Sequence, residues 1–234
     1  MNRKLGLSMR AIGLAAATFL LAGASGNPPA PARPPAHGED PADSITCANL
    51  IYAGSKSSVC FSDKFLATVA QETNVDADRG FTPVKLASED VFNYPFAIMT
   101  GEGAFSLFEQ ERVNLKAYLT RGGFLLASAG CSSREWDQSF RKEFDRIFPD
   151  GELVKIPINH PIYHTVFEIN QIYLKSGGSA LLEGYEIDNR IVLVYSPEGL
   201  NDTGNVRGCC CCGGNEVKNS ERVNTNIITY ALTH

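Results

Sequence analysis

From about residue 45 onward, short apolar runs alternate with amphipathic stretches. Five of the runs have the length and the apolar content of buried strands. They cover residues 49–53, 84–87, 96–100, 124–129 and 153–156. Helix-like stretches separate most of these runs, and this alternation favours a mostly parallel α/β sheet over a helical bundle or a β-sandwich.

Four amphipathic stretches are expected to form helices. They cover residues 62–72, 106–120, 135–147 and 223–232. Ser62 suits the N-cap of the first helix, and Ser106 with Glu109 matches a capping box at the start of the second. Residues 182–195 predict a hairpin that turns at Asp188-Asn189, because both residue types tolerate left-handed backbone conformations. The last helix is expected to pack on the sheet.

The first 24 residues have the composition of a cleaved signal peptide. Arg3, Lys4 and Arg10 precede an apolar run at residues 11–21, and the small residues 22–24 follow it. The run is shorter than the roughly 20 apolar residues that cross a bilayer, so we expect no membrane span in the mature chain. No cysteine follows the run directly, as a lipobox would require. The sequence predicts a periplasmic or secreted protein, with an uncleaved N-terminal anchor as the alternative.

Residues 25–44 are expected to form a proline-rich, disordered linker. The stretch 25–43 holds six of the chain's twelve prolines and no aromatic residue. Such a stretch buries too little apolar surface to offset the entropy lost on folding, so an extended and partly polyproline II spacer is expected. The folded domain is then expected to cover residues 45–234.

The charge of the mature chain narrows the classes of partner. Removal of residues 1–24 takes away three basic residues and no acidic one, which changes the formal net charge from -5 to -8. A protein this acidic repels the phosphate groups of nucleic acids and of anionic lipids. We therefore expect neither as a partner.

Four segments, in the same order along the chain, carry a resemblance to a known family. They read YPFAIMTGEGAFSLFEQERVNLKAYLTRGGFLLASAGC, NHPIYHTVFEI, LEGYEIDNRIVLVYSPEGL and VNTNIITYALTH. Over roughly residues 46–234 the chain resembles the DUF4159 family of bacterial proteins. The resemblance implies a fold similar to that of the class I glutamine amidotransferases, which is a flavodoxin-like three-layer α/β sandwich with a mostly parallel central sheet. It implies no particular activity.

Loops at the carboxyl ends of the expected strands define a candidate ligand pocket, because ligands of open α/β sheets bind there. The residues expected in it are Gly54, Ser55, Lys56, Gly101, Glu102, Gly103 and Ser132, with Ser196 and Pro197 from a further loop. Residues 54–57 also invite comparison with a phosphate-binding loop, but the four-residue spacer after an earlier glycine is missing. The pattern does not identify a small-molecule ligand.

Cys131 is the candidate nucleophile. It follows an expected buried strand and precedes an expected helix, where the resemblance implies a nucleophile on a tight elbow and where a helix N-terminus lowers the pKa of a thiol. The elbow of the related amidotransferases reads Gly-x-Cys-x-Gly, whereas Ala129 and Ser133 stand at the glycine positions here. Their His-x-Glu pair is also missing, since the only late histidine is His234. Glutaminase activity is not expected.

A different catalytic pair would join Cys131 to His160 or His164, with Glu102 or Asp137 orienting the imidazole. The two histidines lie four residues apart, and the proline that follows the first suits the start of a helical turn. Both rings would then face one point, where they could hold a metal ion. In the alternative, His160 caps the turn and His164 packs against a neighbouring aromatic ring.

The seven cysteines are the second source of candidate chemistry. Besides Cys47 and Cys131, they comprise the candidate metal ligands Cys60, Cys209, Cys210, Cys211 and Cys212. Adjacent cysteines point in different directions, so a site for zinc or another soft metal would combine two of the four-residue run with Cys60, Cys131 or the histidines. The alternatives are thiol–disulfide exchange and disulfide staples, such as one from Cys47 to Cys60 and one from the run to another part of the fold.

Three functions are compatible with this sequence. The favoured one is a binding or scaffold module of the cell envelope, which holds a ligand or an envelope protein beside its cysteine-rich loop. The second is a metal- or thiol-dependent enzyme of the hydrolase or amidotransferase kind, with Cys131 and one of the two histidines at its centre. In the third, the protein is purely structural and the cysteines serve only as disulfides.

Overall fold

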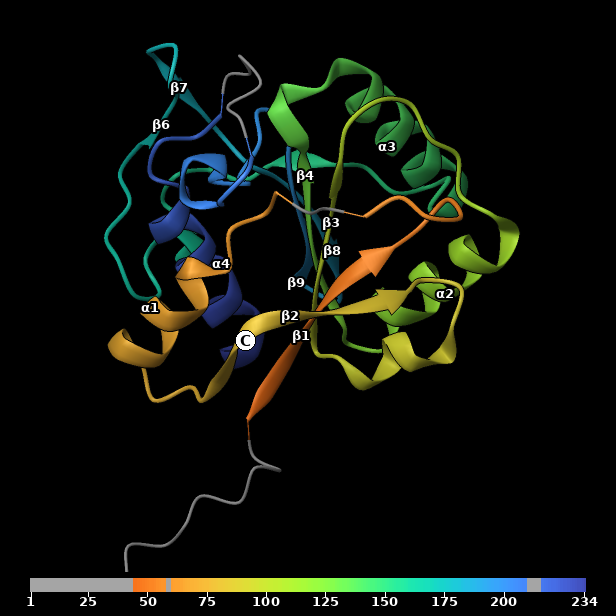
Figure 1. Cartoon of the computed structure of the whole chain (residues 1–234), viewed down its shortest axis with the longest axis horizontal. Helices are drawn as coiled ribbons and strands as arrows, with labels where there is room; N and C mark the ends of the chain where they lie inside the picture. The colour runs from red at the N-terminus through yellow and green to blue at the C-terminus, as the bar shows by residue number, and fades with distance from the viewer. Residues whose placement is uncertain (1–43, 58–59, 210–215) are drawn as a thin grey trace, which may run out of the picture. The chain divides into compact units, whose positions relative to one another are not determined.

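Helices cover both faces of a seven-stranded sheet in the computed structural model, which describes residues 44–57, 60–209 and 216–234 (Figure 1). The strand order is β2-β1-β3-β4-β9-β8-β5. The strands are β1 (Ile45–Ile51), β2 (Ala77–Lys85), β3 (Phe96–Gly101), β4 (Phe124–Ala129), β5 (Val154–Lys155), β8 (Glu183–Ile187) and β9 (Arg190–Ser196). β8 pairs antiparallel with both of its neighbours, β9 and β5, and the other four pairs of strands are parallel. The expected mostly parallel sheet is therefore confirmed.

Four helices form the outer two layers. They are α1 (Lys64–Glu72), α2 (Glu109–Thr120), α3 (Arg134–Ile147) and α4 (Ser220–Thr233). Figure 1 shows α1 and α4 on one side of the sheet and α2 and α3 on the other. The expected three-layer α/β sandwich is confirmed. Within the described part of the chain, no helix combines the length and the apolar composition that a membrane crossing needs.

The central strands owe their continuous apolar runs to burial on both faces. Phe96 and Ile98 of β3 pack into the core under α1 and α4, whereas Ala97 and Met99 pack under α2 and α3. Successive side chains of a strand point to opposite faces, so a strand covered on both sides has mostly apolar residues rather than an alternating pattern. This is why the sequence predicts β3 and β4 almost to the residue.

The edge strand β2 departs from the expectation of a short strand at residues 84–87. It spans Ala77–Lys85 and pairs in parallel with β1, yet only Ala77 and Val84 of its nine residues are buried. An edge strand has one open side and needs few apolar residues. β1 likewise begins at Ile45, four residues before the expected start.

Two helix starts differ from the expectation. α1 begins after Asp63, while the hydroxyl of Ser62 accepts a hydrogen bond from the backbone N–H of Lys64. The capping box expected from Ser106 and Glu109 is wrong, because α2 begins at Glu109. The carboxylate of Glu111 instead accepts the backbone N–H of Phe108 at 2.8 Å, which satisfies one of the free donors at the helix start.

The other expectations for local structure are largely confirmed. Asp188 and Asn189 take φ angles of 54° and 63° and connect β8 to β9 in a hairpin. α3 and α4 lie where the hydrophobic spacing placed them. The small second sheet, β6 (Ile172–Tyr173) with β7 (Ser179–Ala180), was not expected, because two-residue strands leave no periodic signal in the sequence.

Gly101, expected to line a ligand pocket, is required by packing. A Cβ atom at this position would lie 2.5 Å from the hydroxyl oxygen of Tyr52 and 3.1 Å from Nε1 of Trp136. The Tyr52 hydroxyl is fixed in place, since it accepts a hydrogen bond from Trp136 at 2.7 Å and donates one to the carbonyl of Thr100 at 3.1 Å. The end of β3 therefore has no room for a side chain.

We expect Gly101→Ala to lower the free energy of unfolding by about 1–3 kcal/mol, because the new methyl group overpacks this buried contact. Gly204→Ala is the matched control, since no heavy atom lies within 4 Å of the corresponding Cβ position. It should change stability by less than about 0.5 kcal/mol. Urea denaturation of both variants measures the difference, and equal losses would contradict the packing argument.

Candidate functional site

The loops that follow β1, β3, β4 and β9 meet at the carboxyl edge of the sheet. The parallel register places Thr100 of β3 level with Ser128 of β4, and Ser128 level with Ser196 of β9. The loops after these residues consequently leave the sheet side by side. This edge is where the sequence predicted a ligand pocket.

A buried polar network lies directly beneath these loops. The side-chain oxygen of Asn201 accepts hydrogen bonds from the hydroxyl of Thr100 at 3.1 Å and from that of Ser128 at 2.9 Å. The Ser128 hydroxyl in turn accepts the backbone N–H of Leu200 at 2.7 Å. Asn201 is 3% exposed, so these bonds form away from water, where a lost partner costs about 1–3 kcal/mol.

Sequence reasoning missed this network. The signal that could have found it is a polar residue at the end of an apolar run, as Thr100 and Ser128 are in FAIMT and FLLASA. A buried hydroxyl at a strand end needs a partner, and that partner belongs to a neighbouring loop. Asn201 itself lies in a polar stretch and carries no comparable signal.

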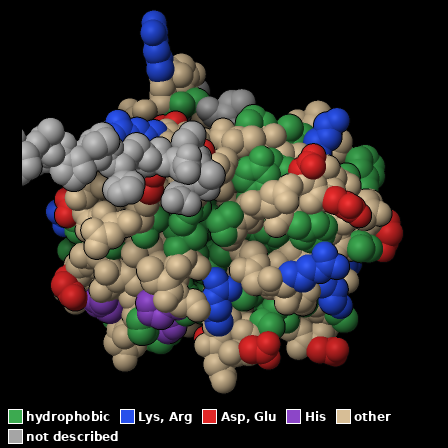
Figure 2. Space-filling view, turned by 90° about the horizontal axis from the view of Figure 1, so that it is seen from below, with side chains coloured by type: hydrophobic (Ala, Val, Ile, Leu, Met, Phe, Trp, Pro, Cys, Tyr) green, Lys and Arg blue, Asp and Glu red, His purple; other side chains and the backbone are tan. Residues whose placement is uncertain are grey.

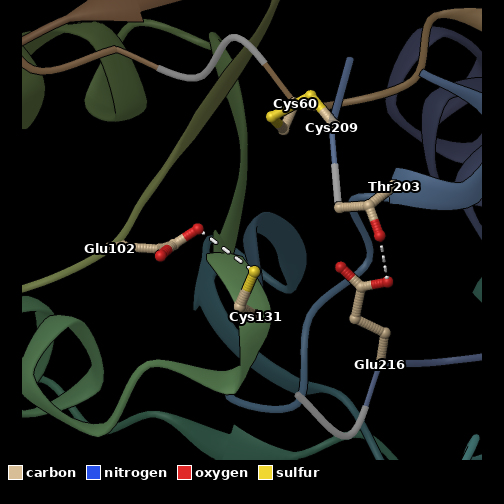
Figure 3. Close-up of a disulfide and its surroundings, with 6 residues drawn as sticks. All are labelled: Cys60, Glu102, Cys131, Thr203, Cys209 and Glu216. Atoms are coloured by element: carbon tan, nitrogen blue, oxygen red, sulfur yellow. Dashed lines mark hydrogen bonds between the residues drawn. A yellow bond between two sulfur atoms is a disulfide. The ribbon is translucent and has the colours of Figure 1, made fainter. Parts of the chain in front are cut away.

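The structure brings two of the expected pocket residues, Lys56 and Glu102, together with the candidate nucleophile Cys131. The ammonium group of Lys56 donates a hydrogen bond to the carbonyl oxygen of Glu102 at 3.2 Å, and Oε1 of Glu102 lies 3.1 Å from Sγ of Cys131 (Figure 3). Gly54 and Ser55 lie in the tight turn that the Tyr52–Lys56 backbone pairing closes. The loops after β1, β3 and β4 thus touch.

Gly103 and Ser132 hold neighbouring loops in position. The backbone N–H of Gly103 donates to the hydroxyl of Ser133, the N-cap of α3, at 3.0 Å. The hydroxyl of Ser132 donates to the carbonyl of Glu198 at 2.6 Å. Each bond joins two of the loops, so both expected pocket residues contribute to the rigidity of the edge.

Cys131 has the backbone of a tight elbow. Its φ of 51° and ψ of 30° lie in the left-handed region, and Ser132 follows with a φ of 53°. A non-glycine residue seldom adopts this conformation. Cys131 is disulfide-bonded, so its sulfur is not a thiolate and does not act as a nucleophile in this state.

A disulfide between Cys60 and Cys209 joins two parts of the edge that lie 149 residues apart in the sequence (Figure 3). It connects the segment before α1 to the segment that precedes α4. The expected staple from the cysteine run to another part of the fold is confirmed for Cys209. While the bond exists, neither sulfur is available as a thiolate ligand.

The illustrative pairing of Cys47 with Cys60 is wrong. Cys47 is a free thiol in the core beneath α1, and burial foremost, followed by the charge of Asp78, raises its pKa to about 12. A buried thiol of this kind behaves as a small apolar side chain. Cys210, Cys211 and Cys212 lie outside the described residues, so their predicted role as ligands of zinc or another soft metal stays a prediction. The described residues contain no group of three or more His, Cys, Asp or Glu side chains placed to hold a metal ion.

Glu216 forms a buried ion pair with Lys175, and Figure 3 shows its hydrogen bond to Thr203. Its side chain is 3% exposed, and Oε2 accepts hydrogen bonds from the hydroxyl of Thr203 at 2.8 Å and from the ammonium of Lys175 at 2.6 Å. Lys175 lies in the turn between β6 and β7. The pair therefore ties that small sheet to the segment before α4.

His160 caps a short helical turn, as the alternative prediction had it. Its Nδ1 accepts the backbone N–H of Ile162 at 3.1 Å, at the start of the turn Pro161–Tyr163. An accepting Nδ1 places the proton of the neutral ring on Nε2, which then has no lone pair for a metal ion or a substrate proton. Burial foremost lowers the pKa of His160 below its usual 6.5, which favours this neutral form.

His164 uses both ring nitrogens in fixed contacts. Nε2 lies 2.9 Å from the carbonyl oxygen of Ile158, and Nδ1 lies 2.8 Å from Oε2 of Glu168. The carbonyl only accepts and the carboxylate favours a donor, so the protonated ring satisfies both. The hydrogen bond to Ile158, and then the one to Glu168, raise the pKa of His164 above its usual 6.5.

The structure does not bring His160 to Cys131. The ring of His160 packs against Tyr230, which packs against Phe124 at the amino end of β4. Cys131 follows the carboxyl end of the same strand. Six residues at about 3.3 Å each separate the two ends by about 20 Å, far beyond a hydrogen bond.

The fold and its edge define a class: a three-layer α/β domain with a rigid loop surface at the carboxyl ends of its parallel strands. The chain belongs to the family described as Domain of unknown function (DUF4159), whose model matches residues 47–232. No curated protein matches the sequence.

We expect Cys60→Ala and Cys209→Ala each to lower the free energy of unfolding by about 3–5 kcal/mol, because the bond closes a long loop of the unfolded chain. The double variant should lose no more than either single one, since each substitution alone already removes the bond. Denaturation without reductant measures all three. Additive losses would mean that the two cysteines stabilise the fold separately.

The two histidines should give stability opposite dependences on pH. A raised pKa makes the contribution of His164 complete below pH 6.5 and lost as pH rises through its folded-state value. The lowered pKa of His160 makes its contribution complete above pH 6.5 and lost as pH falls through its folded-state value.

Unfolding free energies measured across this range test both signs. His164→Gln should flatten the alkaline side of the profile and leave the acid side unchanged. His160→Asn, which keeps an N-cap acceptor without a titrating ring, should flatten only the acid side. If both variants flattened the same side of the pH profile of stability, the two rings would not titrate independently.

Proposed function

We propose that this protein is a binding or scaffold module of the cell envelope, which holds a ligand or a partner protein on the carboxyl-edge loops. One observation carries the proposal. The groups that would perform catalysis are engaged elsewhere: Cys131 is disulfide-bonded, His160 caps a turn and His164 bridges Ile158 and Glu168. What the edge offers a partner is a fixed surface.

The rigidity of that surface supports a binding role. The loops after β3, β4 and β9 share the Asn201 network, and the disulfide fixes the segment before α1 to the same edge. A surface held in one conformation loses little entropy when a partner binds. Rigid loops at this edge are where ligands of α/β sheets bind.

An exposed aromatic side chain gives the surface an anchor. Phe108, which precedes α2, is 60% exposed, and its ring lies beside Gly54, where a Cβ atom would approach it to 3.8 Å. Lys56 lies in the same turn as Gly54. Aromatic residues bordered by polar groups commonly contribute most of the binding energy at protein interfaces.

Export through a signal peptide at residues 1–24 is part of the proposal. Disulfides persist in oxidising compartments such as the periplasm, and the Cys60–Cys209 bond suits a periplasmic or secreted protein. The proline-rich linker at residues 25–44 would then separate the cleavage site from the domain.

Relationship to the class I glutamine amidotransferase-like superfamily is also proposed. The layer order and the left-handed backbone at Cys131, between a buried strand and a helix, support it. Ala129 and Ser133 at the glycine positions of the elbow depart from that pattern. A thiolate at Cys131 would also be disfavoured by the carboxylate of Glu102 at 3.1 Å, since like charges repel. We therefore propose that the protein is related to this superfamily but has no glutaminase activity.

Photo-crosslinking in living cells tests the binding surface. A photoreactive phenylalanine analogue is placed at Phe108 or at Ser55 on the carboxyl edge, and at Val113 as the matched control. Val113 is 51% exposed on the outer side of the same helix, α2. We expect one adduct of the same mass from positions 108 and 55 and none from position 113.

Equal labelling from all three positions, or none from any, would reject the carboxyl edge as the binding surface. The export part is tested separately by sequencing the N-terminus of the protein recovered from the periplasm or the medium. Ser25 should be its first residue. Protein found only in the cytoplasm with residue 1 intact would reject export and leave the edge hypothesis standing.

A further inference from the structure

A hollow of about 710 Å³ lies between the small sheet of β6 and β7 and the loop that follows β9. Small-molecule pockets commonly have volumes of about 300–1,000 Å³, so the hollow is large enough for a ligand. We call it the Glu198 hollow. It is lined by residues 170–172 and 179–181 beside the small sheet, by Lys155 of β5 and Glu183 of β8, and by Pro197 and Glu198 of the loop.

The carboxylate of Glu198 lacks a donor for one of its oxygens. Oε2 is buried and has no hydrogen-bond partner among the residues that the structure describes. The backbone N–H of Glu198 hydrogen-bonds to the carboxylate, but it supplies no positive charge. A buried carboxylate without a cation is costly, because neither water nor the fold compensates its charge. The group therefore favours the uptake of a proton or of a cation.

The charged groups near Glu198 do not supply that cation. Arg141 is close enough to lower the pKa of Glu198, but its Nε donates to Asp137 at 2.8 Å. Its two terminal nitrogens donate to the two oxygens of Glu183 at 2.7 and 3.0 Å. Lys155 is exposed, and its ammonium makes no ion pair in the described part of the chain. Burial foremost, and also the charges of Glu183 and Asp137, raises the pKa of Glu198.

The lack of a cation at Glu198 is not a general feature of the domain. On the face drawn in Figure 2, lysine and arginine side chains lie among the aspartate and glutamate side chains. Among the described residues, one other buried carboxylate oxygen has no hydrogen bond, and it belongs to Glu216. The second oxygen of Glu216 pairs with the ammonium of Lys175 at 2.6 Å. Glu198 therefore differs from Glu216 in having no cation of its own.

The donor set of the hollow favours an ammonium over other cations. The described residues contain no group of three or more His, Cys, Asp or Glu side chains placed to hold a metal ion. A guanidinium binds best through two parallel N–H groups that use both oxygens of a carboxylate, as Arg141 does with Glu183. Glu198 has one oxygen without a donor, which suits the compact charge of an ammonium.

The walls of the hollow suit an aliphatic stem behind the ammonium. Leu181 is 38% exposed and Pro197 is half-buried, and both line the hollow. The exposed side chains of Asn170 and Gln171 also line it, and their amides make no hydrogen bond within the described part of the chain. Rotation about the last side-chain bond of Glu198 is soft, so its free oxygen can turn toward the hollow.

We propose that the Glu198 hollow binds a ligand through a primary alkylammonium group, for which Glu198 is the counter-ion. Leu181 and Pro197 pack against the alkyl stem. This inference deepens the binding role proposed above and rests on it, because the loop after β9 belongs to the carboxyl edge. Positions 55 and 108, which test that role, do not line the hollow, so either test can fail without the other.

The probe is Nα-acetyl-lysine methylamide, which carries one alkylammonium group. It is titrated into the full isotope-labelled chain at neutral pH while the backbone amide signals of Ala180 and Glu198 are followed by nuclear magnetic resonance. We expect saturable shifts of both signals, and none with the matched compound whose ammonium is acetylated. Pentylamine is titrated in parallel. Saturation by both amines would identify a free amine as sufficient, and saturation by the lysine derivative alone would identify an ammonium carried by a peptide.

Two variants test the counter-ion. Glu198→Gln should weaken binding of the lysine probe about tenfold or more, because it removes the negative charge and keeps the shape of the side chain. The same variant should not lower the melting temperature, because a neutral amide costs less to bury than a carboxylate without a cation. Glu72→Gln removes an equal charge at the exposed end of α1 and should leave binding unchanged.

The proposal is overturned if neither amine shifts the signals of Ala180 and Glu198 in a saturable way. It is also overturned if the acetylated compound binds as well as the lysine probe, because the hollow would then not recognise the charge. Equal effects of Glu198→Gln and Glu72→Gln on binding would place the amine elsewhere on the domain. A lower melting temperature of Glu198→Gln would mean that the carboxylate already has its partner in the fold, which also contradicts the proposal.

Discussion

The buried carboxamide of Asn201 joins parts of the chain that are far apart in the sequence. Its oxygen holds the ends of β3 and β4 through Thr100 and Ser128, and its backbone carbonyl accepts the N–H of Ser62 just before α1. The preceding residue, Leu200, accepts a hydrogen bond from Asn224 of α4. The positions of β3, β4, α1 and α4 relative to one another therefore depend on hydrogen bonds to Leu200 and Asn201.

Because these bonds are buried, they are hard to replace one at a time. An apolar residue at position 201 would leave the hydroxyls of Thr100 and Ser128 without their acceptor, in a place that water does not reach. The network thus fixes the carboxyl edge in a single arrangement, and the disulfide and the Glu216 ion pair act on loops that this arrangement has already positioned.

The limits of the strands were predicted best where helices cover both faces of a strand, and worst for the edge strand and the very short strands. β3 and β4 are almost wholly apolar, with Thr100 and Ser128 as polar exceptions near their ends, so the sequence alone indicates where these strands begin and end. The polar edge strand β2 and the two-residue strands β6 and β7 are held by pairing that no local pattern records. The start of α2 was misplaced because Glu111 of the helix itself, rather than Ser106, satisfies the first free donor.

For the candidate site, it was easier to predict which residues lie at the carboxyl edge than to predict which groups their side chains contact. The approach of Cys131 to Glu102 followed from two loops at one edge of a parallel sheet. Spacing left open whether His160 caps its turn or faces a shared site with His164, and it did not indicate that His164 contacts the carbonyl of Ile158. A ring nitrogen is available for chemistry only if the fold leaves its lone pair free, and that depends on contacts beyond the reach of sequence spacing.

The route by which β9 enters the sheet affects how the domain can be made in the cell. β9 enters the sheet directly from the antiparallel strand β8 through a hairpin, and α4, which follows β9 in the chain, covers part of the sheet. α4 is the last element of the described chain to leave the ribosome. Until Ser220–Thr233 have been synthesised, the apolar face that contains Ile98 and Leu126 lacks half of its cover. The domain therefore closes over this face only when its last described helix has docked on the sheet.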